Sequence, residues 1–355
     1  MSFVSYGYNM LDNNASVLLI YTGGTIGMVE DPETGMLRTY DFGHLKEYVP
    51  ELSRLKFHID SVHFSEPIDS SDMSPEKWKK IVWLIEDNYS QYDGFVILHG
   101  TDTMAYSASA LSFMLENLDK PVILTGSQLP IGKIRTDGKE NLITALEIAV
   151  DKDPEGNAFV TEVCIFFQNF LMRGNRTTKI NAANFKAFNS FNFPILAEAG
   201  THIRYRHDLI HHPLPNSKPK FHYALDSNIA IIKLFPGISA SVLKAMIEIP
   251  HLKGIVLETY GSGNAPGKKW FLDIIEEAVN KGIVVVNVSQ CASGSVNMQR
   301  YESGIALKHI GVLSGYDITT EAAVAKLMFL FGHGLDRREV KTSMKVALVG
   351  EATIE

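Results

Sequence analysis

Short apolar runs alternate with amphipathic segments through most of the first two hundred residues, and this alternation limits the chain to an α/β fold. The strand-like runs are residues 17–20, 95–98, 121–125 and 163–167. The helix-like segments are residues 74–88, 103–117 and about 139–150. This βαβ order predicts a mostly parallel sheet that is covered by helices on both faces.

The composition changes near residue 205, where a stretch rich in proline, histidine and asparagine shows little periodicity. Because 355 residues are many for one hydrophobic core, we expect two domains. Further strands are expected at 229–234, 254–258 and 282–288, and further helices near 239–249, 268–281 and 320–332. The predicted organisation is an N-terminal extension (1–16), a catalytic α/β domain (17–204), a linker (205–226) and a C-terminal α/β domain (227–355).

Charge and cysteine content argue against several classes of protein. The net charge of -7 does not suit nucleic acid, whose phosphates require a basic protein face. Two cysteines, Cys164 and Cys291, do not form a disulfide framework and fit a reducing compartment. The sequence shows no secretory signal and no apolar run of the roughly twenty residues that span a membrane. We therefore expect a cytoplasmic protein that has neither nucleic acid nor a membrane as partner.

Two of the predicted strands run into glycine-rich turns that carry threonine. YTGGTIG occupies residues 21–27, directly after the first strand, and HGTDTM occupies residues 99–104, directly after the second. Open α/β sheets bind ligands outside the carboxyl ends of their strands. Such a turn could cradle a phosphate, hold an exposed nucleophile or be no more than a tight connection. Neither segment matches the P-loop or the dinucleotide-binding fingerprint, so the phosphate interpretation is weak.

An aspartate next to the second threonine favours a nucleophilic hydrolase. A threonine hydroxyl is a poor nucleophile, and it needs a base or a cation nearby to lower its proton affinity. Asp102 follows Thr101 directly, and Lys179 at the end of RGNRTTK (173–179) is a candidate cation. The alternative for this basic segment is an ordinary solvated loop.

Three further groups of polar residues have both a functional and a structural interpretation. DSSDM (69–73) suits the charged groups of an amino acid, or it is a plain helix entry. Residues 260–267 form either a binding loop or a flexible hairpin. His207, His211 and His212 lack carboxylate partners, so an exposed histidine cluster is favoured over a metal site. We expect no metal ion and no cofactor.

Together the threonine segments resemble those of the bacterial cytoplasmic type I L-asparaginases, which are homo-oligomeric amidohydrolases that convert asparagine to aspartate and ammonia. Residues 21–28 resemble the first threonine signature of that family, and FVILHGTDTMAYSASALSFML (95–115) resembles the second. Similarity continues in PVILTGSQLP (121–130), RGNRTTK (173–179), GSGNAP (261–266) and GIVVVNVSQCASGSVNM (282–298). The resemblance implies a larger N-terminal α/β domain and a smaller flavodoxin-like C-terminal one.

The resemblance also assigns roles to residues of this chain. Thr25 corresponds to the primary nucleophile of the family. Thr101, Asp102 and Lys179 correspond to its second threonine, its acidic residue and its lysine. In that family the lysine and the aspartate tune the second threonine, which relays a proton during acyl transfer.

Two more residues correspond to substrate contacts. Ser70 matches a residue that holds the α-carboxylate of the substrate, and Asp102 also reaches the α-amino group. Asn264 matches a residue that the neighbouring subunit contributes to the pocket. The resemblance therefore implies a homo-oligomer, either a dimer or a dimer of dimers, that acts on L-asparagine.

The chain departs from the family pattern in two places. Some members carry a tyrosine in the loop after the first signature, where this chain has Met36, with Tyr40 four residues further on. Allosterically activated members bind an effector asparagine through an arginine at the position of Glu258. A carboxylate there would repel the effector, so we predict no such activation, although Thr178 and Cys291 match other effector-site positions.

Other functions on the same scaffold stay open at this point. A glutaminase or another amidase differs in a pocket by as little as one methylene, which is worth only about 1–3 kcal/mol. A catalytically silent module that binds an amino acid is a further alternative. It would have no use for two poised hydroxyl groups, so we favour an L-asparaginase.

Overall fold

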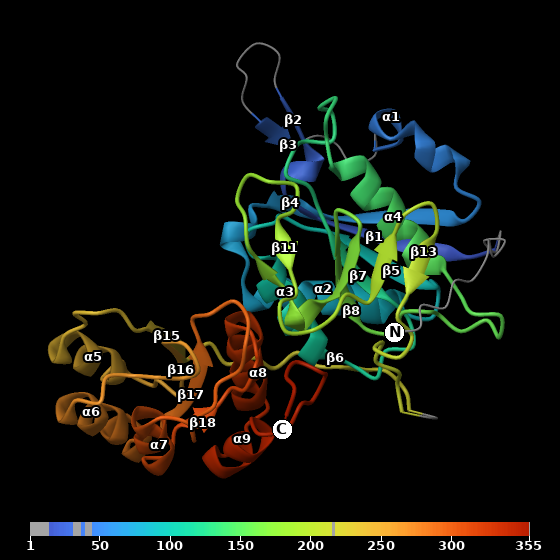
Figure 1. Cartoon of the computed structure of the whole chain (residues 1–355). Helices are drawn as coiled ribbons and strands as arrows, with labels where there is room; N and C mark the ends of the chain where they lie inside the picture. Colours follow the sequence, from blue (N-terminus) through green and yellow to red (C-terminus); the bar gives the residue numbers. More distant parts are fainter. Residues whose placement is uncertain (1–13, 31–36, 40–44, 215–216, 355) are drawn as a thin grey trace. The chain divides into compact units, whose positions relative to one another are not determined.

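The computed structural model describes residues 14–30, 37–39, 45–214 and 217–354. Contacts between residues divide the chain into two compact units, Met1–Tyr223 and Ala224–Glu355. Each unit is an α/β structure, which confirms the predicted fold class (Figure 1). The finer four-part division that was drawn from the sequence stays a prediction.

The first unit is built on an eight-stranded sheet with the order β13-β12-β9-β8-β7-β5-β1-β4. Its strands are β1 (Ser16–Gly23), β4 (His58–Ile68), β5 (Gly94–Leu98), β7 (Val122–Thr125), β8 (Val163–Phe167), β9 (Phe170–Arg173), β12 (Ala197–Ala199) and β13 (Ile203–Tyr205). The strands from β8 to β4 in this order run parallel to their neighbours. Beyond β8 the pairing is antiparallel, so the sheet is mixed rather than parallel throughout.

The helices of the first unit are α1 (Leu45–Tyr48), α2 (Pro75–Asn88), α3 (Met104–Met114) and α4 (Gly138–Val150), with 3-10 turns at Thr25–Gly27, Pro50–Arg54, Ser70–Asp72 and Gly174–Arg176. Two-stranded pairs add β2 (Met28–Glu30) with β3 (Leu37–Thr39), β6 (Leu115–Glu116) with β14 (Lys220–Phe221), and β10 (Thr178–Lys179) with β11 (Phe188–Asn189). The helix expected over 103–117 ends at Met114, because the next two residues pair with β14.

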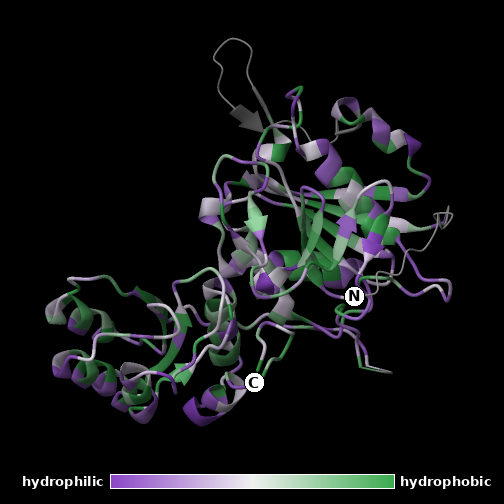
Figure 2. Ribbon diagram, in the orientation of Figure 1, coloured by the Kyte–Doolittle hydropathy of each residue, from purple (hydrophilic) through white to green (hydrophobic). Residues whose placement is uncertain are grey.

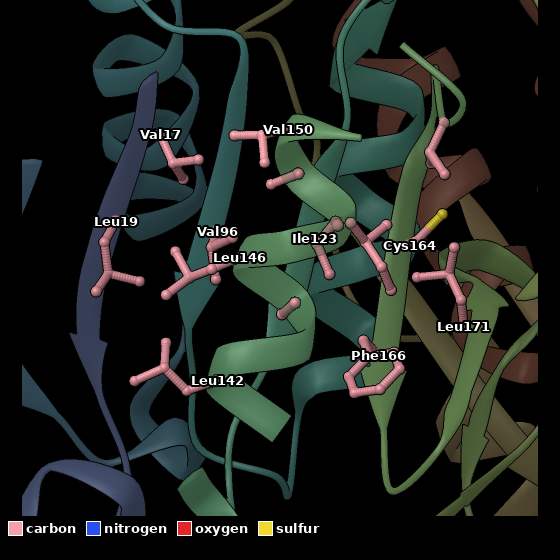
Figure 3. Packing of buried hydrophobic residues seen from close by; sticks show 14 of the residues in the cluster. Val17, Leu19, Val96, Ile123, Leu142, Leu146, Val150, Cys164, Phe166 and Leu171 are labelled. Carbon is pink, nitrogen blue, oxygen red and sulfur yellow. The ribbon is translucent and has the colours of Figure 1, made fainter. Parts of the chain in front are cut away.

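One face of the large sheet is covered by α4. Leu142, Leu146 and Val150 recur every four residues on this helix and point onto the strands, as Figure 3 shows. Val17 and Leu19 of β1 alternate along the strand and meet this face, and all five side chains are buried. Burying one such side chain contributes about 1.5–3 kcal/mol. This packing holds β1, β5, β7 and β8 in one rigid sheet.

The second unit contains a parallel four-stranded sheet in the order β15-β16-β17-β18. Its strands are β15 (Ile229–Lys233), β16 (Gly254–Thr259), β17 (Val284–Ser289) and β18 (Leu313–Ser314). Its helices are α5 (Ala240–Ile247), α6 (Lys269–Asn280), α7 (Glu302–His309), α8 (Thr320–Gly332) and α9 (Arg337–Ser343). Apolar residues concentrate in the sheets of both units (Figure 2). The strand expected from Gly282 starts two residues later, because Gly282 has a φ of 96° in the turn after α6.

Among the residues that the structure describes, no helix is both long enough and apolar enough to cross a membrane. Cys164 is buried, Cys291 is exposed, and neither forms a disulfide.

Candidate active site

The turns that carry the two threonines touch each other through glycine. β1, β5 and β7 are parallel neighbours, so their carboxyl ends open at the same edge of the sheet. Gly24 has a φ of 91°, and a Cβ on it would lie 2.5 Å from the backbone nitrogen of Gly100. A Cβ on Gly100 would in turn lie 2.6 Å from the Ser70 Oγ. Because a side chain would separate these backbones, the close approach of the two turns and Ser70 requires glycine.

Lys179 lies between the predicted acidic residue and the second threonine. Its Nζ donates to Thr101 Oγ1 at 2.8 Å and to Asp102 Oδ1 at 2.6 Å. The Lys179 side chain is 16% exposed, and that of Asp102 is 66% exposed. The structure therefore brings together the cation, the carboxylate and the hydroxyl group that the sequence singled out, at the carboxyl end of β5. Such a cation favours the deprotonated form of the hydroxyl that it contacts.

Thr25 and Ser70 lie in the turns next to this cluster. Thr25 begins a 3-10 turn at the end of β1 and is partly buried. Ser70 is 4% exposed, and its carbonyl oxygen accepts a hydrogen bond from Thr103 Oγ1 at 2.7 Å. This bond joins the Ser70 turn to the start of α3, directly after Asp102.

A buried hydrogen-bond chain supports the second threonine turn from behind. His99 Nδ1 lies 2.6 Å from the Gly100 carbonyl oxygen, which can only accept, so Nδ1 carries the proton. Ser107 Oγ then donates to His99 Nε2 at 2.8 Å, and Trp78 Nε1 donates to Ser107 Oγ at 2.9 Å. Burial lowers the pKa of His99 to about 4, so the ring is neutral near pH 7. The chain fixes the peptide that precedes Thr101.

Gln128 also contacts this cluster, although no sequence pattern singled it out. Thr101 Oγ1 donates to Gln128 Oε1 at 3.3 Å, and Gln128 Nε2 donates to the Asn184 carbonyl oxygen at 3.0 Å. The Asp137 carboxylate orders this turn by accepting from the backbone nitrogens of Gln128 and Leu129, at 3.0 and 3.1 Å. The turn follows β7, so the same rule about carboxyl strand ends could have indicated it.

Comparisons with known proteins identify the family of the chain. A family model described as "Asparaginase, N-terminal" matches residues 16–211, and one described as "Glutaminase/Asparaginase C-terminal domain" matches residues 228–344. The chain belongs to the asparaginase family. It is 47% identical to L-asparaginase 1 of Escherichia coli over 344 residues, which cover 95% of this chain and 98% of that protein.

Two further relatives show the range of the family. The crystal structure of L-asparaginase I from Vibrio cholerae matches with a TM-score of 0.86 and 42% identity, over 96% of this chain and all of that one. The 60 kDa lysophospholipase of Mus musculus is also 42% identical, over 95% of this chain and 62% of its own length. The relatives with more than 40% identity to this chain therefore include a protein that is named a lysophospholipase and not an asparaginase.

Asn264 lies in the second unit, in the turn after β16. Its carbonyl oxygen accepts from the Tyr260 backbone nitrogen at 2.9 Å, and its side-chain oxygen accepts from Ser303 Oγ at 3.4 Å. Met36 and Tyr40, at which the sequence departs from some family members, lie outside the described residues.

Glu258, at the position of the family's effector-binding arginine, is paired within its own unit. The carboxylate lies 3.2 Å from Lys233 Nζ and accepts from Thr320 Oγ1 at 2.7 Å. The side chain is 13% exposed. The Glu258 carboxylate itself would repel an incoming carboxylate, and it partly offsets the charge of its neighbour Lys233.

The histidines of the predicted linker lie within the first unit. The His211 backbone nitrogen donates to Glu162 Oε1 at 2.8 Å, and the His207 ring lies 4.9 Å from that of Phe159. Within the part of the chain that the structure describes, no group of three or more His, Cys, Asp or Glu side chains is arranged to hold a metal ion.

Proposed function

We propose that this protein is an L-asparaginase, which hydrolyses L-asparagine to L-aspartate and ammonia through an ester on Thr25. The observation that carries the proposal is the Lys179 ammonium, which donates to both Thr101 and Asp102 beside the turn of Thr25. Membership of the family and the 47% identity to L-asparaginase 1 of Escherichia coli support the substrate.

The reaction has two halves. In the first, Thr25 Oγ attacks the side-chain amide carbon of asparagine, and backbone N–H groups of the glycine-rich turns stabilise the tetrahedral oxyanion. The C–N bond then breaks, and the leaving ammonia takes up the proton lost by Thr25. In the second, water attacks the aspartyl ester, the C–O bond to Thr25 breaks and the hydroxyl is restored. The products are L-aspartate and ammonia.

Thr101 serves as the proton relay in this scheme. The Lys179 ammonium donates to Thr101 Oγ1 and so lowers the cost of removing the proton of this hydroxyl group. Asp102 holds the lysine by its own bond at 2.6 Å. The Thr101 hydroxyl donates to Gln128 Oε1, which is not a base. Substrate or water must therefore replace Gln128 as the partner of this proton before it is transferred.

Ser70 and Asp102 bind the α-carboxylate and the α-amino group of the substrate. Ser70 is buried beside Gly100, where its hydroxyl can donate to the α-carboxylate. The Asp102 carboxylate is largely exposed and carries the charge that an α-amino group requires. Recognition of both groups would select free asparagine over an asparagine residue in a peptide, where both groups are tied up in peptide bonds.

We further propose that a second copy of the chain completes each pocket through its Asn264, in a cytoplasmic homo-oligomer. Asn264 lies in a turn held by the Tyr260–Asn264 backbone pair, so its side chain is presented from a fixed backbone. The proposal predicts that Asn264→Ala raises KM while leaving the fold of each unit intact.

Ammonia release from L-asparagine and L-glutamine, measured over a wide range of concentrations, tests the function. We expect turnover of asparagine with much less from glutamine. Comparable rates with both would favour a glutaminase-asparaginase. Binding of either amino acid without ammonia release would favour a silent binding module and contradict the proposal.

A further inference from the structure

We infer that Gly174 is a positioning residue for Lys179: its contact with Ala108 sets the distance from the Lys179 ammonium to Thr101 and Asp102. The inference rests on the proposed function for its kinetic readout. Gly174 belongs to the 3-10 turn Gly174–Arg176, and Ala108 belongs to helix α3. Neither Gly174 nor Ala108 takes part in the chemistry.

The contact between Gly174 and Ala108 leaves no room for a side chain on the glycine. A Cβ on Gly174 would lie 2.9 Å from Ala108 Cβ and 3.0 Å from the Val163 carbonyl oxygen. Both distances are shorter than ordinary van der Waals contact, which begins at about 3.5 Å between carbon atoms. The absence of a side chain is therefore what lets the 3-10 turn Gly174–Arg176 rest directly on α3 and β8.

The segment from Gly174 to Lys179 is held rigidly, so a displacement of the turn would be passed to the lysine. Thr177 Oγ1 donates to the Arg173 carbonyl oxygen at 2.7 Å and closes the turn. Arg173 forms a buried ion pair with Glu162, with Nε 2.6 Å from Oε2. Thr177 is fully buried, and Lys179 follows two residues later in the short strand β10. These contacts leave little freedom between the turn and the lysine.

The other side of the contact is equally rigid. Ala108 lies on α3 four residues after Met104, the first residue of the helix, so one helical turn separates them. Thr101 and Asp102 come directly before the N-cap residue of this helix, Thr103. A shift of the 3-10 turn away from α3 would therefore move the ammonium away from both of its partners.

The bonds of Lys179 are sensitive to such a shift. They measure 2.8 Å to Thr101 and 2.6 Å to Asp102, and a displacement of several tenths of an ångström weakens both. A misplacement of about 1 Å can cost about 10²-fold in rate. We therefore expect Gly174→Ala to lower kcat about tenfold while changing KM less than about threefold, because the lost interaction acts mainly in the transition state.

The test compares the full-length wild type with Gly174→Ala, Ala108→Gly and the double variant. Removing the Ala108 methyl group relieves the shorter contact, while the Val163 carbonyl oxygen stays 3.0 Å from the new Cβ. The double variant should therefore regain part of the lost kcat. Gly254→Ala is the matched control, since its Cβ would lie 2.8 Å from Ile229 Cδ1 in the second unit. It should lower the melting temperature without changing kcat. A wild-type kcat in Gly174→Ala, or a loss that Ala108→Gly does not reduce at all, would overturn the inference.

Ala108→Val adds bulk to the same contact from the helix side. It serves as the test variant if Gly174→Ala does not fold. The expected loss of kcat is the same, and a wild-type value would again overturn the inference.

Acetylation of Lys179, followed by mass spectrometry, reports the displacement independently of any activity. The rate is measured relative to that of exposed Lys186 in the same molecule. Gly174→Ala should raise the relative rate, and Ala108→Gly should reduce the rise. An unchanged rate counts against the inference even if the wild type proves inactive on asparagine, an outcome that would contradict only the proposed function.

Discussion

At the scale of single residues, the site depends on one lysine that serves two partners. The Lys179 ammonium is shared between a hydroxyl and a carboxylate, so it can assist proton transfer at Thr101 only while Asp102 holds it. A neutral side chain at this position would leave the hydroxyl with its ordinary, very low acidity. The proposed relay therefore requires a positive charge at position 179, as well as a side chain long enough to reach Thr101.

Replacing this lysine should strongly reduce the rate. We expect Lys179→Met to lower kcat about 10²–10⁴-fold, the range typical of a lost acid–base group. Lys186→Met is the matched control, because it removes the same charge from an exposed position in the adjoining loop. Ammonia release by both variants provides the measurement. A near-normal kcat for Lys179→Met would show that the lysine is structural.

The buried His99 should make the stability of the protein depend on pH. Its pKa is about 4 in the folded chain, compared with an ordinary value of 6.5. Above pH 6.5 the ring is neutral in both states. Between pH 6.5 and 4 the unfolded chain binds a proton that the folded chain does not, so stability falls as the pH falls. The loss from this residue reaches about 3 kcal/mol near pH 4.

Denaturant unfolding at pH 7 and pH 4.5 measures this effect. His99→Asn keeps a donor for the Gly100 carbonyl but cannot be protonated, so it should lose less stability between the two pH values than the wild type. The comparison cancels the contributions of all other titrating groups. Equal losses in both proteins would contradict the assignment of a neutral ring.

Much of the site could be predicted residue by residue. Thr101, Asp102 and Lys179 meet as the sequence indicated: the first two directly follow a recognisable strand, and the lysine stands out by its charge in a polar segment. Gln128 was missed, since an isolated glutamine carries no charge and no distinctive spacing. Its position after β7 could have indicated the turn, but the contact with Thr101 crosses neighbouring strands and is not visible in a linear pattern.

At the scale of elements, buried strands and amphipathic helices were predicted best. β5 and β8 are continuous apolar runs, and the start of α2 is marked by Pro75 after Ser74. β4 was missed because most of its side chains are exposed and polar, as expected at the edge of a sheet. The end of α3 was misplaced because its pairing partner, β14, lies about a hundred residues away.

A buried ion pair connects α8 to the C-terminal segment. Lys326 Nζ lies 2.6 Å from Glu351 Oε1, and the two side chains are 1% and 0% exposed. The Glu351 carboxylate also accepts from the backbone nitrogens of Leu348 and Val349. Segment 345–354 has no helix or strand, so these contacts hold it in place.

Breaking this pair should destabilise the second unit. We expect Glu351→Ala to cost about 3–5 kcal/mol in the free energy of unfolding, because it leaves the Lys326 charge buried without its partner. Lys326→Met combined with Glu351→Leu should recover a large part of this loss. Asp273→Ala, which breaks an exposed pair with Lys269, is the control and should change the stability little. A small effect of Glu351→Ala would show that the segment is not anchored by this pair.

At the scale of the whole molecule, the sequence predicted two α/β units but not how a complete pocket is assembled. The first unit carries Thr25, Ser70, Thr101 and Lys179, whereas Asn264 belongs to the second. A contribution from a neighbouring copy is a property of an assembly, and no pattern within one chain encodes its geometry. The oligomeric state is therefore a proposal that rests on the resemblance.

Glu258 bears on the predicted absence of activation by asparagine. Its carboxylate is paired with Lys233 and Thr320, so the charge of Lys233 is partly offset by Glu258 where an effector carboxylate would need a cation. We expect the rate to rise hyperbolically with asparagine concentration, with a Hill coefficient of about one. Initial rates from low to saturating asparagine provide the measurement, and clear sigmoidicity would contradict the prediction.

The most direct test of the central claim is to identify the residue that carries the acyl group. The enzyme is mixed with L-asparagine, quenched in acid within the first turnovers and digested for peptide mass spectrometry. We expect an aspartyl group on the peptide that contains Thr25, and none on the same peptide of Thr25→Ala. This variant should fold but release no ammonia. An aspartyl group on the Thr101 peptide, or continued turnover by Thr25→Ala, would contradict the claim.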